Sequence, residues 1–229
     1  MRAPIAVALD VPSLDDAIHH TKNLAASVMM VKIGLQSYLR DGNQGVRAIN
    51  EHLAGAQLFL DLKLHDIPQT VAGAVASIKQ LNPSVLTVHA AGGSEMLKAA
   101  VETTQEIDIA AVTILTSLSE TDVSQFSSYP IADLVLRLTD QAVAAGCRAI
   151  VCSPHEVKAI RKNFGNELKL IVPGVRMPGD AAADQKRIAT PAETVAAGAS
   201  ILVMGRSLLM AQDPIAQLSA VTESLRDFR

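Results

Sequence analysis

Aromatic residues are scarce in this sequence. Phe, Trp and Tyr together make up 3% of the 229 residues, and tryptophan is absent. Proteins that bind nucleic acids use aromatic side chains to stack on bases and clustered Lys and Arg to contact phosphates. The formal net charge is −3 and no basic cluster stands out. We therefore expect no nucleic-acid partner.

The sequence also lacks long apolar segments and closely spaced cysteines. No apolar run approaches the roughly 18 residues that a membrane span requires, and the first residues do not resemble a signal peptide. The two cysteines, Cys147 and Cys152, lie in apolar surroundings and match no Cys-x-x-Cys pattern. These absences predict no membrane association, reduced thiols and a cytoplasmic location.

The sequence does contain a repeated alternation of short apolar runs and longer segments of helical period. This alternation is typical of βαβ units with a parallel sheet. Hydrophobic residues make up 49% of the chain, enough for one sizeable core. Eight repeats in a chain of this length predict a single (β/α)8 TIM barrel over residues 1–229, with a parallel eight-stranded sheet. The expected strands span 5–9, 28–33, 58–64, 85–89, 109–115, 149–152, 168–172 and 200–204.

The clearest helix follows the third apolar run. Apolar residues recur at helical spacing over 71–81, and Pro68 suits the first turn of that helix. Two longer segments, 117–130 and 176–190, show no clear period, so we expect loops there. The second follows the seventh strand and is a candidate active-site lid.

Polar or charged residues stand at or just after the ends of all eight apolar runs. Active sites of β/α barrels lie at the carboxyl ends of the strands. A buried strand that ends in charge without a partner is unfavourable, so we expect these side chains to form one site. They are Asp10, Lys32, Asp61 with Lys63 and Asp66, His89, Thr116 with Ser117, Ser153, Arg176, and Gly205 with Arg206.

The densest group is Asp61-Leu62-Lys63-Leu64-His65-Asp66. On a strand, Asp61 and Lys63 point to the same face because they are two residues apart. Taken alone, such a pair is more often a structural ion pair, and Asp66 before Pro68 has an alternative interpretation as a helix N-cap. Lys32 adds a second cation near the end of the second strand. An array of alternating charges favours a catalytic interpretation.

The loops after strands 7 and 8 of β/α barrels often bind phosphate. Gly205 permits close approach of the backbone, and Arg206 offers a bidentate donor. Arg176 and Gln185 lie on the loop after the seventh strand. A simple turn with a solvated arginine is the alternative for Gly205 and Arg206, but their place in the barrel favours a phosphate site.

A metal site is not favoured. His65, Asp66 and His89 match no recognised ligand spacing, and Lys32 stands where a carboxylate ligand would be needed. The Gly-rich turn after His89 has the composition of an anion site, yet a histidine that supports the core is the better interpretation.

These motifs resemble the orotidine 5′-phosphate decarboxylase family, nearly from end to end. The resemblance is carried by Ala8-Leu9-Asp10, Val31-Lys32-Ile33-Gly34, the signature from Asp61 to Pro68, His89-Ala90-Ala91-Gly92-Gly93, Leu115-Thr116-Ser117, Val172-Pro173-Gly174-Val175-Arg176, Gly179-Asp180 with Asp184-Gln185, and Met204-Gly205-Arg206. Gln69 and Met177 depart from the usual pattern, but neither belongs to the charge array.

The resemblance implies decarboxylation of orotidine 5′-phosphate to UMP and CO2, the last step of de novo UMP synthesis, without metal or organic cofactor. It implies that Lys63 is the proton donor in a network of Lys32, Asp61, Lys63 and Asp66. Asp66 and Thr70 would reach the site of the other subunit of a homodimer. The implied substrate contacts are Asp10, Lys32, Asp61, Ile67, Thr70, Thr116, Ser117, Pro173, Arg176, Gln185, Gly205 and Arg206.

Two alternatives remain at this stage. The first is a metal-dependent sugar-phosphate decarboxylase or lyase of the same superfamily, which carries an acidic residue on strand 2 where this chain has Lys32. The second is a non-catalytic protein that binds nucleotides through the phosphate site alone. Lys32 argues against the first, and the intact set of Lys32, Asp61, Lys63 and Asp66 argues against the second.

Overall fold

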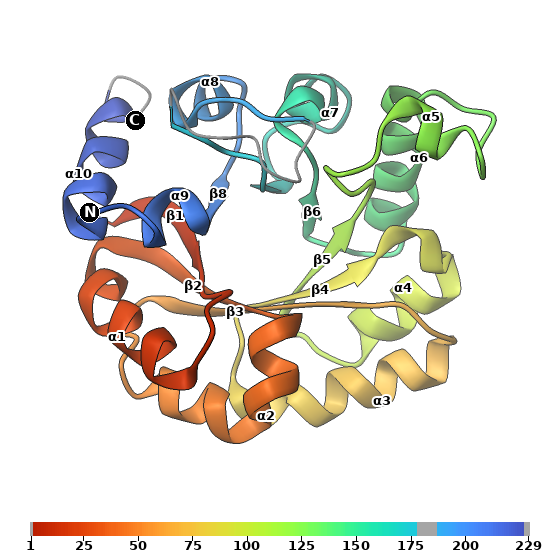
Figure 1. Cartoon of the computed structure of the whole chain (residues 1–229). Helices are drawn as coiled ribbons and strands as arrows, with labels where there is room; N and C mark the ends of the chain where they lie inside the picture. The colour runs from red at the N-terminus through yellow and green to blue at the C-terminus, as the bar shows by residue number, and fades with distance from the viewer. Residues whose placement is uncertain (1, 178–186, 227–229) are drawn as a thin grey trace.

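The protein folds as a closed barrel of eight parallel strands that follow one another in chain order (Figure 1). The computed structural model describes residues 2–177 and 187–226. The closed ring of eight parallel strands confirms the predicted (β/α)8 barrel. The strands are β1 (Ala3–Ala8), β2 (Val28–Gly34), β3 (Gln57–Leu64), β4 (Val85–His89), β5 (Asp108–Val112), β6 (Ala149–Val151), β7 (Lys169–Val172) and β8 (Ile201–Met204).

The helices lie outside the ring of strands (Figure 1). The α-helices are α1 (Leu14–Leu24), α2 (Leu35–Asn50), α3 (Pro68–Ile78), α4 (Ser94–Glu102), α5 (Glu120–Val123), α6 (Ile131–Ala144), α7 (Val157–Phe164), α8 (Pro191–Ala196), α9 (Arg206–Leu209) and α10 (Pro214–Ser224). The 3₁₀ turns are η1 (Ala25–Ser27), η2 (Lys79–Leu81), η3 (Ala90–Gly92) and η4 (Pro154–Glu156). Among the described residues, no helix is both long and apolar enough to cross a membrane.

All eight predicted strands are present, with two corrections in the segment that follows β4. The fifth strand was expected over 109–115 but ends at Val112. The segment 117–130 was expected to be a loop, yet it contains α5, because Ser119 and Asp122 form a capping box. Helix α3 begins at Pro68 as predicted.

The core has two layers, one inside the barrel and one between the barrel and its helices. Strand side chains alternate between them, since successive residues point to opposite faces. Met30, Phe59 and Val85 fill the interior, while Leu58 and Leu60 pack outward against the helices. The next inward positions on β2, β3 and β4 are residues 32, 61 and 87. The alternation that buries the core therefore also delivers polar side chains to the carboxyl-terminal mouth.

Both cysteines are free and buried, as the sequence predicts for reduced thiols. Burial raises the pKa of the Cys147 thiol to about 12 and also raises the pKa of Cys152. Each is therefore a neutral thiol that packs as a small apolar side chain.

Candidate active site

A chain of alternating charges lies at the mouth of the barrel. The Lys32 Nζ atom is 3.3 Å from Asp10 Oδ2 and 3.1 Å from Asp61 Oδ2. The Lys63 Nζ atom is 2.6 Å from the other Asp61 oxygen, Oδ1. Lys32 is only 4% exposed, so its ammonium group is stabilised mainly by these two carboxylates.

Burial alone would raise the pKa of Asp61. The ammonium groups of Lys32 and Lys63 outweigh this effect and lower the pKa of Asp61 to about 2. Burial alone would likewise lower the pKa of Lys32, but Asp61 and Asp10 outweigh it and raise that pKa. Asp61 and Lys32 are therefore both charged at neutral pH, and a strong fixed field is present before any substrate binds.

The local backbone permits this close approach at two positions. A Cβ atom at Gly34 would collide with Asp10 Oδ1 and lie 2.9 Å from Lys32 Nζ, so a larger residue there would displace the ion pair. Lys63 adopts φ 49°, in the left-handed region. That conformation costs about 1–2 kcal/mol for a residue with a side chain, and the surrounding contacts must hold it.

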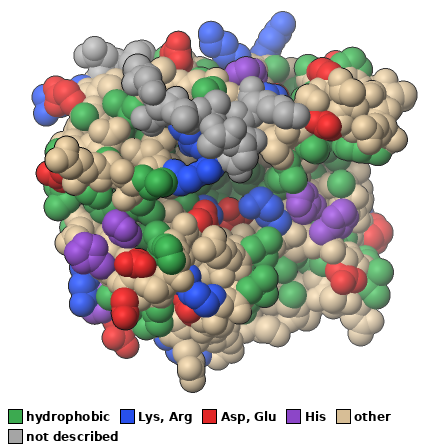
Figure 2. Space-filling view, in the orientation of Figure 1, with side chains coloured by type: hydrophobic (Ala, Val, Ile, Leu, Met, Phe, Trp, Pro, Cys, Tyr) green, Lys and Arg blue, Asp and Glu red, His purple; other side chains and the backbone are tan. Residues whose placement is uncertain are grey.

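The charged side chains face a cavity of about 940 Å³, a size typical of sites for small molecules. Figure 2 shows acidic and basic side chains gathered in the hollowed middle of this face. The cavity unites ten residues that the sequence predicted for the site. They are Asp10, Lys32, Asp61, Lys63, Thr116, Ser117, Pro173, Arg176, Gly205 and Arg206.

Three other predicted residues lie outside this cavity. Asp66, Ile67 and Thr70 are all exposed, and Ile67 is 66% exposed. Asp66 Oδ1 accepts a hydrogen bond from the N–H of Ile67 (2.7 Å). The N-cap of α3 is Ile67, and no side chain caps that helix, so the alternative of Asp66 as the N-cap is wrong. Gln185 lies outside the described residues.

The predicted phosphate residues lie at the junction of β8 and α9. Gly205 is the N-cap of α9 and Arg206 is its first residue, directly after β8. Both line the cavity with Arg176, which is largely buried and enters from the chain after β7. Ser207 Oγ is also buried and has no hydrogen-bond partner among the described residues. The part of this corner that lines the cavity therefore offers guanidinium and backbone N–H groups to an anion.

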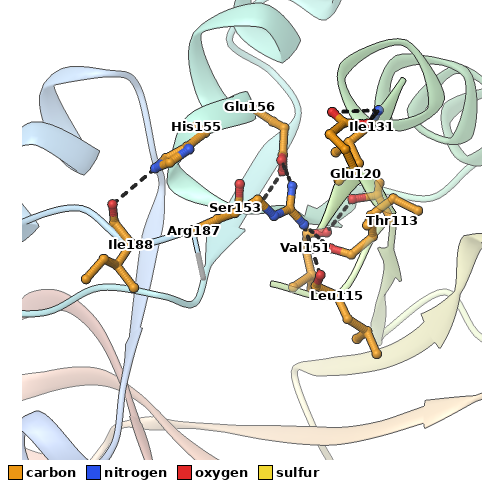
Figure 3. Close-up of polar contacts among 11 residues, drawn as sticks. Thr113, Leu115, Glu120, Ile131, Val151, Ser153, His155, Glu156, Arg187 and Ile188 are labelled. Atoms are coloured by element: carbon orange, nitrogen blue, oxygen red, sulfur yellow. Dashed lines mark hydrogen bonds and ion pairs between the residues drawn. The ribbon is translucent and has the colours of Figure 1, made fainter. Parts of the chain in front are cut away.

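An unpredicted ion pair joins the chain after β7 to the ends of β5 and β6 (Figure 3). Arg187 pairs with the buried carboxylate of Glu156, which also accepts a hydrogen bond from the Ser153 N–H (2.6 Å). The second Arg187 nitrogen donates to the carbonyls of Ile114 (3.1 Å) and Leu115 (3.0 Å). These carbonyls directly precede the predicted contact Thr116, so the pair supports the cavity wall.

Sequence reasoning missed this pair because its partners lie 31 residues apart, in connecting segments without a periodic pattern. The Ser-x-x-Glu spacing of Ser153 and Glu156 was a visible local signal. Thr87 on β4, whose Oγ1 lies 3.1 Å from Asp61 Oδ1, was missed for a different reason. It looks like an ordinary strand residue until β3 is placed beside β4.

His89 lies beside the charge network without lining the cavity. Its ring centroid is 5.4 Å from that of His65. Burial, followed by His65 and Lys63, lowers the pKa of His89. The neutral form is therefore favoured, in keeping with a supporting role.

Comparisons with known proteins agree with this geometry. A family model described as orotidine 5′-phosphate decarboxylase / HUMPS family matches residues 3–221. The chain is 49% identical to an orotidine 5′-phosphate decarboxylase of Thermobifida fusca, over 99% of this chain and 97% of the relative. It is 43% identical to one of Novosphingobium aromaticivorans, over 98% and 100%. A crystal structure of orotidine 5′-phosphate decarboxylase from Lactobacillus acidophilus matches with a TM-score of 0.82 and 32% identity, over 97% of this chain and 99% of that one.

Proposed function

Because the chain belongs to the orotidine 5′-phosphate decarboxylase / HUMPS family, we propose that it converts orotidine 5′-phosphate to UMP and CO2. This reaction is the last step of de novo UMP synthesis. The observation that carries the proposal is the Lys32–Asp61–Lys63 array, which faces the same cavity as Arg206. A site of this kind suits a small anionic substrate whose reaction develops negative charge.

Loss of CO2 from C6 of the pyrimidine leaves the bonding electron pair on a carbon with no adjacent electron sink. An ammonium group beside that carbon stabilises the developing carbanion and then donates the proton that forms the new C–H bond. Lys63 takes this role. Asp61 holds its ammonium at 2.6 Å and stays ionised, since its pKa is about 2. Solvent then returns a proton to Lys63.

The other cavity residues position the substrate. Asp10 and Lys32 contact the ribose, and Thr116 with Ser117 contacts the pyrimidine. The remaining contacts are Pro173 and Arg176, with Gln185, Gly205 and Arg206 for the phosphate. This assignment places the phosphate at the β8–α9 corner, where Gly205 and Arg206 line the cavity.

Electrostatic contact alone is too weak for the reaction. Two unit charges about 4 Å apart interact by roughly 4 kcal/mol at an effective dielectric of 20, whereas enzymes lower barriers by about 8–23 kcal/mol. Binding energy from the remote phosphate must therefore also contribute, by holding the reacting carbon against Lys63.

We further propose that the active protein is a homodimer whose sites are shared. Asp66, Ile67 and Thr70 belong to the predicted site but are exposed on the outside of their own cavity. Leu39 on α2 is 78% exposed, and Leu35 on the same helix is partly exposed. We propose that a second copy covers these apolar side chains and that Asp66 and Thr70 reach the site of that copy. There Asp66 completes the Lys-Asp-Lys-Asp network, and its negative charge destabilises the bound substrate by repelling the substrate carboxylate.

The proposed reaction needs no metal or organic cofactor. In the metal-dependent alternative, a cation would have to lie among the carboxylates at the barrel mouth. Here the ammonium of Lys32 lies between Asp10 and Asp61, and a metal would have to displace it. We propose that residues 1–229 form one catalytic domain, supported by strands from Ala3 to Met204 that close a single barrel. A cytoplasmic location, which the free buried cysteines support, stays a prediction.

The test is the fall in orotidine 5′-phosphate absorbance after addition of the purified protein, with and without EDTA. We expect rapid loss of substrate, formation of UMP and no effect of EDTA. Activity that EDTA abolishes would instead support the metal-dependent alternative. A folded protein that binds UMP without turnover would refute the catalytic proposal.

A further inference from the structure

The hydrogen-bond ladder between β3 and β4 is interrupted at the charge network. The last regular pair is Leu60 with Leu86, and pairing resumes at Leu64 with Val88. Three residues of β3 thus lie opposite one residue of β4, which is Thr87. Such a bulge redirects side chains and leaves backbone groups without their usual sheet partners. The N–H groups inside it must therefore find other acceptors.

Thr87 provides one of these acceptors. Its Oγ1 accepts a hydrogen bond from the N–H of Lys63 at 2.8 Å. The same hydroxyl lies 3.1 Å from Asp61 Oδ1 and donates to it, because an ionised carboxylate can only accept. Asp61 Oδ1 also accepts from Lys63 Nζ at 2.6 Å. One hydroxyl therefore holds both the backbone of Lys63 and the carboxylate that binds its ammonium.

The hydrogen bonds of Thr87 differ from those that an ordinary buried threonine makes. Thr139, which is also fully buried, donates to the carbonyl of Val135 one turn earlier in its own helix. Thr87 instead joins two residues of the charge network across neighbouring strands. One of them, Lys63, is held in the left-handed region of backbone conformation. Thr87 does not line the cavity, so its contacts reach the substrate only through those two residues.

We infer that Thr87 is a positioning residue for the reaction, and that its hydroxyl sets where the Lys63 ammonium points. This inference rests on the proposed function, because it needs Lys63 to act on a substrate. A displacement of 1 Å in a catalytic group can lower the rate by about 100-fold. Loss of the Thr87 hydroxyl should therefore lower kcat while leaving the substrate contacts of the cavity in place.

The experiment compares Thr87→Val and Thr87→Ser with Thr139→Val as the matched buried control. We expect kcat for orotidine 5′-phosphate to fall about 10- to 100-fold in Thr87→Val. KM and the Kd for UMP should stay within about threefold of wild type, since the cavity lining is unchanged. Thr87→Ser keeps the hydroxyl and should retain most of kcat, and Thr139→Val should match wild type.

Provided that the wild-type protein is active, three results would overturn the inference. They are an unchanged kcat in Thr87→Val, an equal loss in the Val and Ser variants, and a loss of UMP affinity that parallels the loss of kcat. If Thr87→Val does not fold, Thr87→Ser and Thr87→Cys form a second pair of similar shape but unequal hydrogen-bond strength, and kcat must be higher in the Ser variant. An inactive wild type would refute the proposed function rather than the role of Thr87.

Discussion

Replacement of Lys63 by alanine tests the proposed chemistry most directly. The change removes the ammonium that lies 2.6 Å from Asp61 Oδ1. It leaves Asp61 paired with Lys32 at 3.1 Å, so no buried charge loses all its partners. The Lys63 side chain is partly exposed, and its loss creates no sealed cavity. We therefore expect the Lys63→Ala protein to fold.

The expected loss of activity follows from two contributions. Removal of one unit charge about 4 Å from the reacting carbon forfeits roughly 4 kcal/mol at an effective dielectric of 20, which is about a thousandfold in rate. Loss of the positioned proton donor removes a further factor of about 10²–10⁴. Turnover should therefore be abolished at the sensitivity of an absorbance assay.

The assay follows the absorbance of orotidine 5′-phosphate with wild type, Lys63→Ala and the control Lys98→Ala. Lys98 pairs with Glu95 on the solvent-facing side of α4, and both side chains are exposed, so its variant should keep wild-type kcat. Circular dichroism and thermal unfolding establish that each variant is folded. A folded Lys63→Ala protein with near-normal kcat would refute the assignment of Lys63 as proton donor.

Three further predictions concern the site shared between subunits, the pKa of Asp61 and the close backbone approach at Gly34. Asp66→Asn and Lys63→Ala chains, each inactive alone, should regain partial activity when mixed; no recovery after confirmed subunit exchange would contradict a shared site. The lowered pKa of Asp61, about 2 against 3.8, stabilises the fold above pH 4, and this contribution disappears as the pH falls towards 2. In urea titrations, the destabilisation by Asp61→Asn should therefore be about 1 kcal/mol smaller at pH 3 than at pH 6, and a pH-independent difference would contradict this linkage. Gly34→Ala should lower kcat/KM at least about tenfold, because its Cβ collides with the charge network, whereas the control Gly73→Ala meets nothing within 4 Å and should leave kcat/KM unchanged.

The barrel was predictable because its signal is repeated and local. Each strand is an apolar run buried on both faces, and each helix carries one apolar stripe, so eight repeats reinforce one interpretation. The charge network was predictable for a related reason. Lys32 and Asp61 continue the inward alternation of Met30 and Phe59, and polar residues at inward strand ends must face the mouth.

Features that depend on neighbouring strands were not predictable from local patterns. The period of two places Asp61 and Lys63 on one face, but the chain reaches this geometry through a bulge with Lys63 at φ 49°. No spacing in the sequence reveals that bulge. The Arg187–Glu156 ion pair likewise joins η4 to the chain after β7, two segments that the closed barrel brings together. The partner site of Asp66 requires a second chain and stays a prediction.

Thr87 illustrates why local reasoning fails at such a position. In the sequence it is one β-branched residue in Val85-Leu86-Thr87-Val88, and any strand tolerates it there. Its proposed role depends on the register of β3 against β4, which places three residues of β3 opposite Thr87. The bulge costs regular sheet hydrogen bonds and a strained Lys63, and the Thr87 hydroxyl restores one hydrogen bond at that residue. The same interruption of the ladder thus both weakens the sheet and orients the ammonium group, which is why we expect its supporting hydroxyl to affect kcat more than folding.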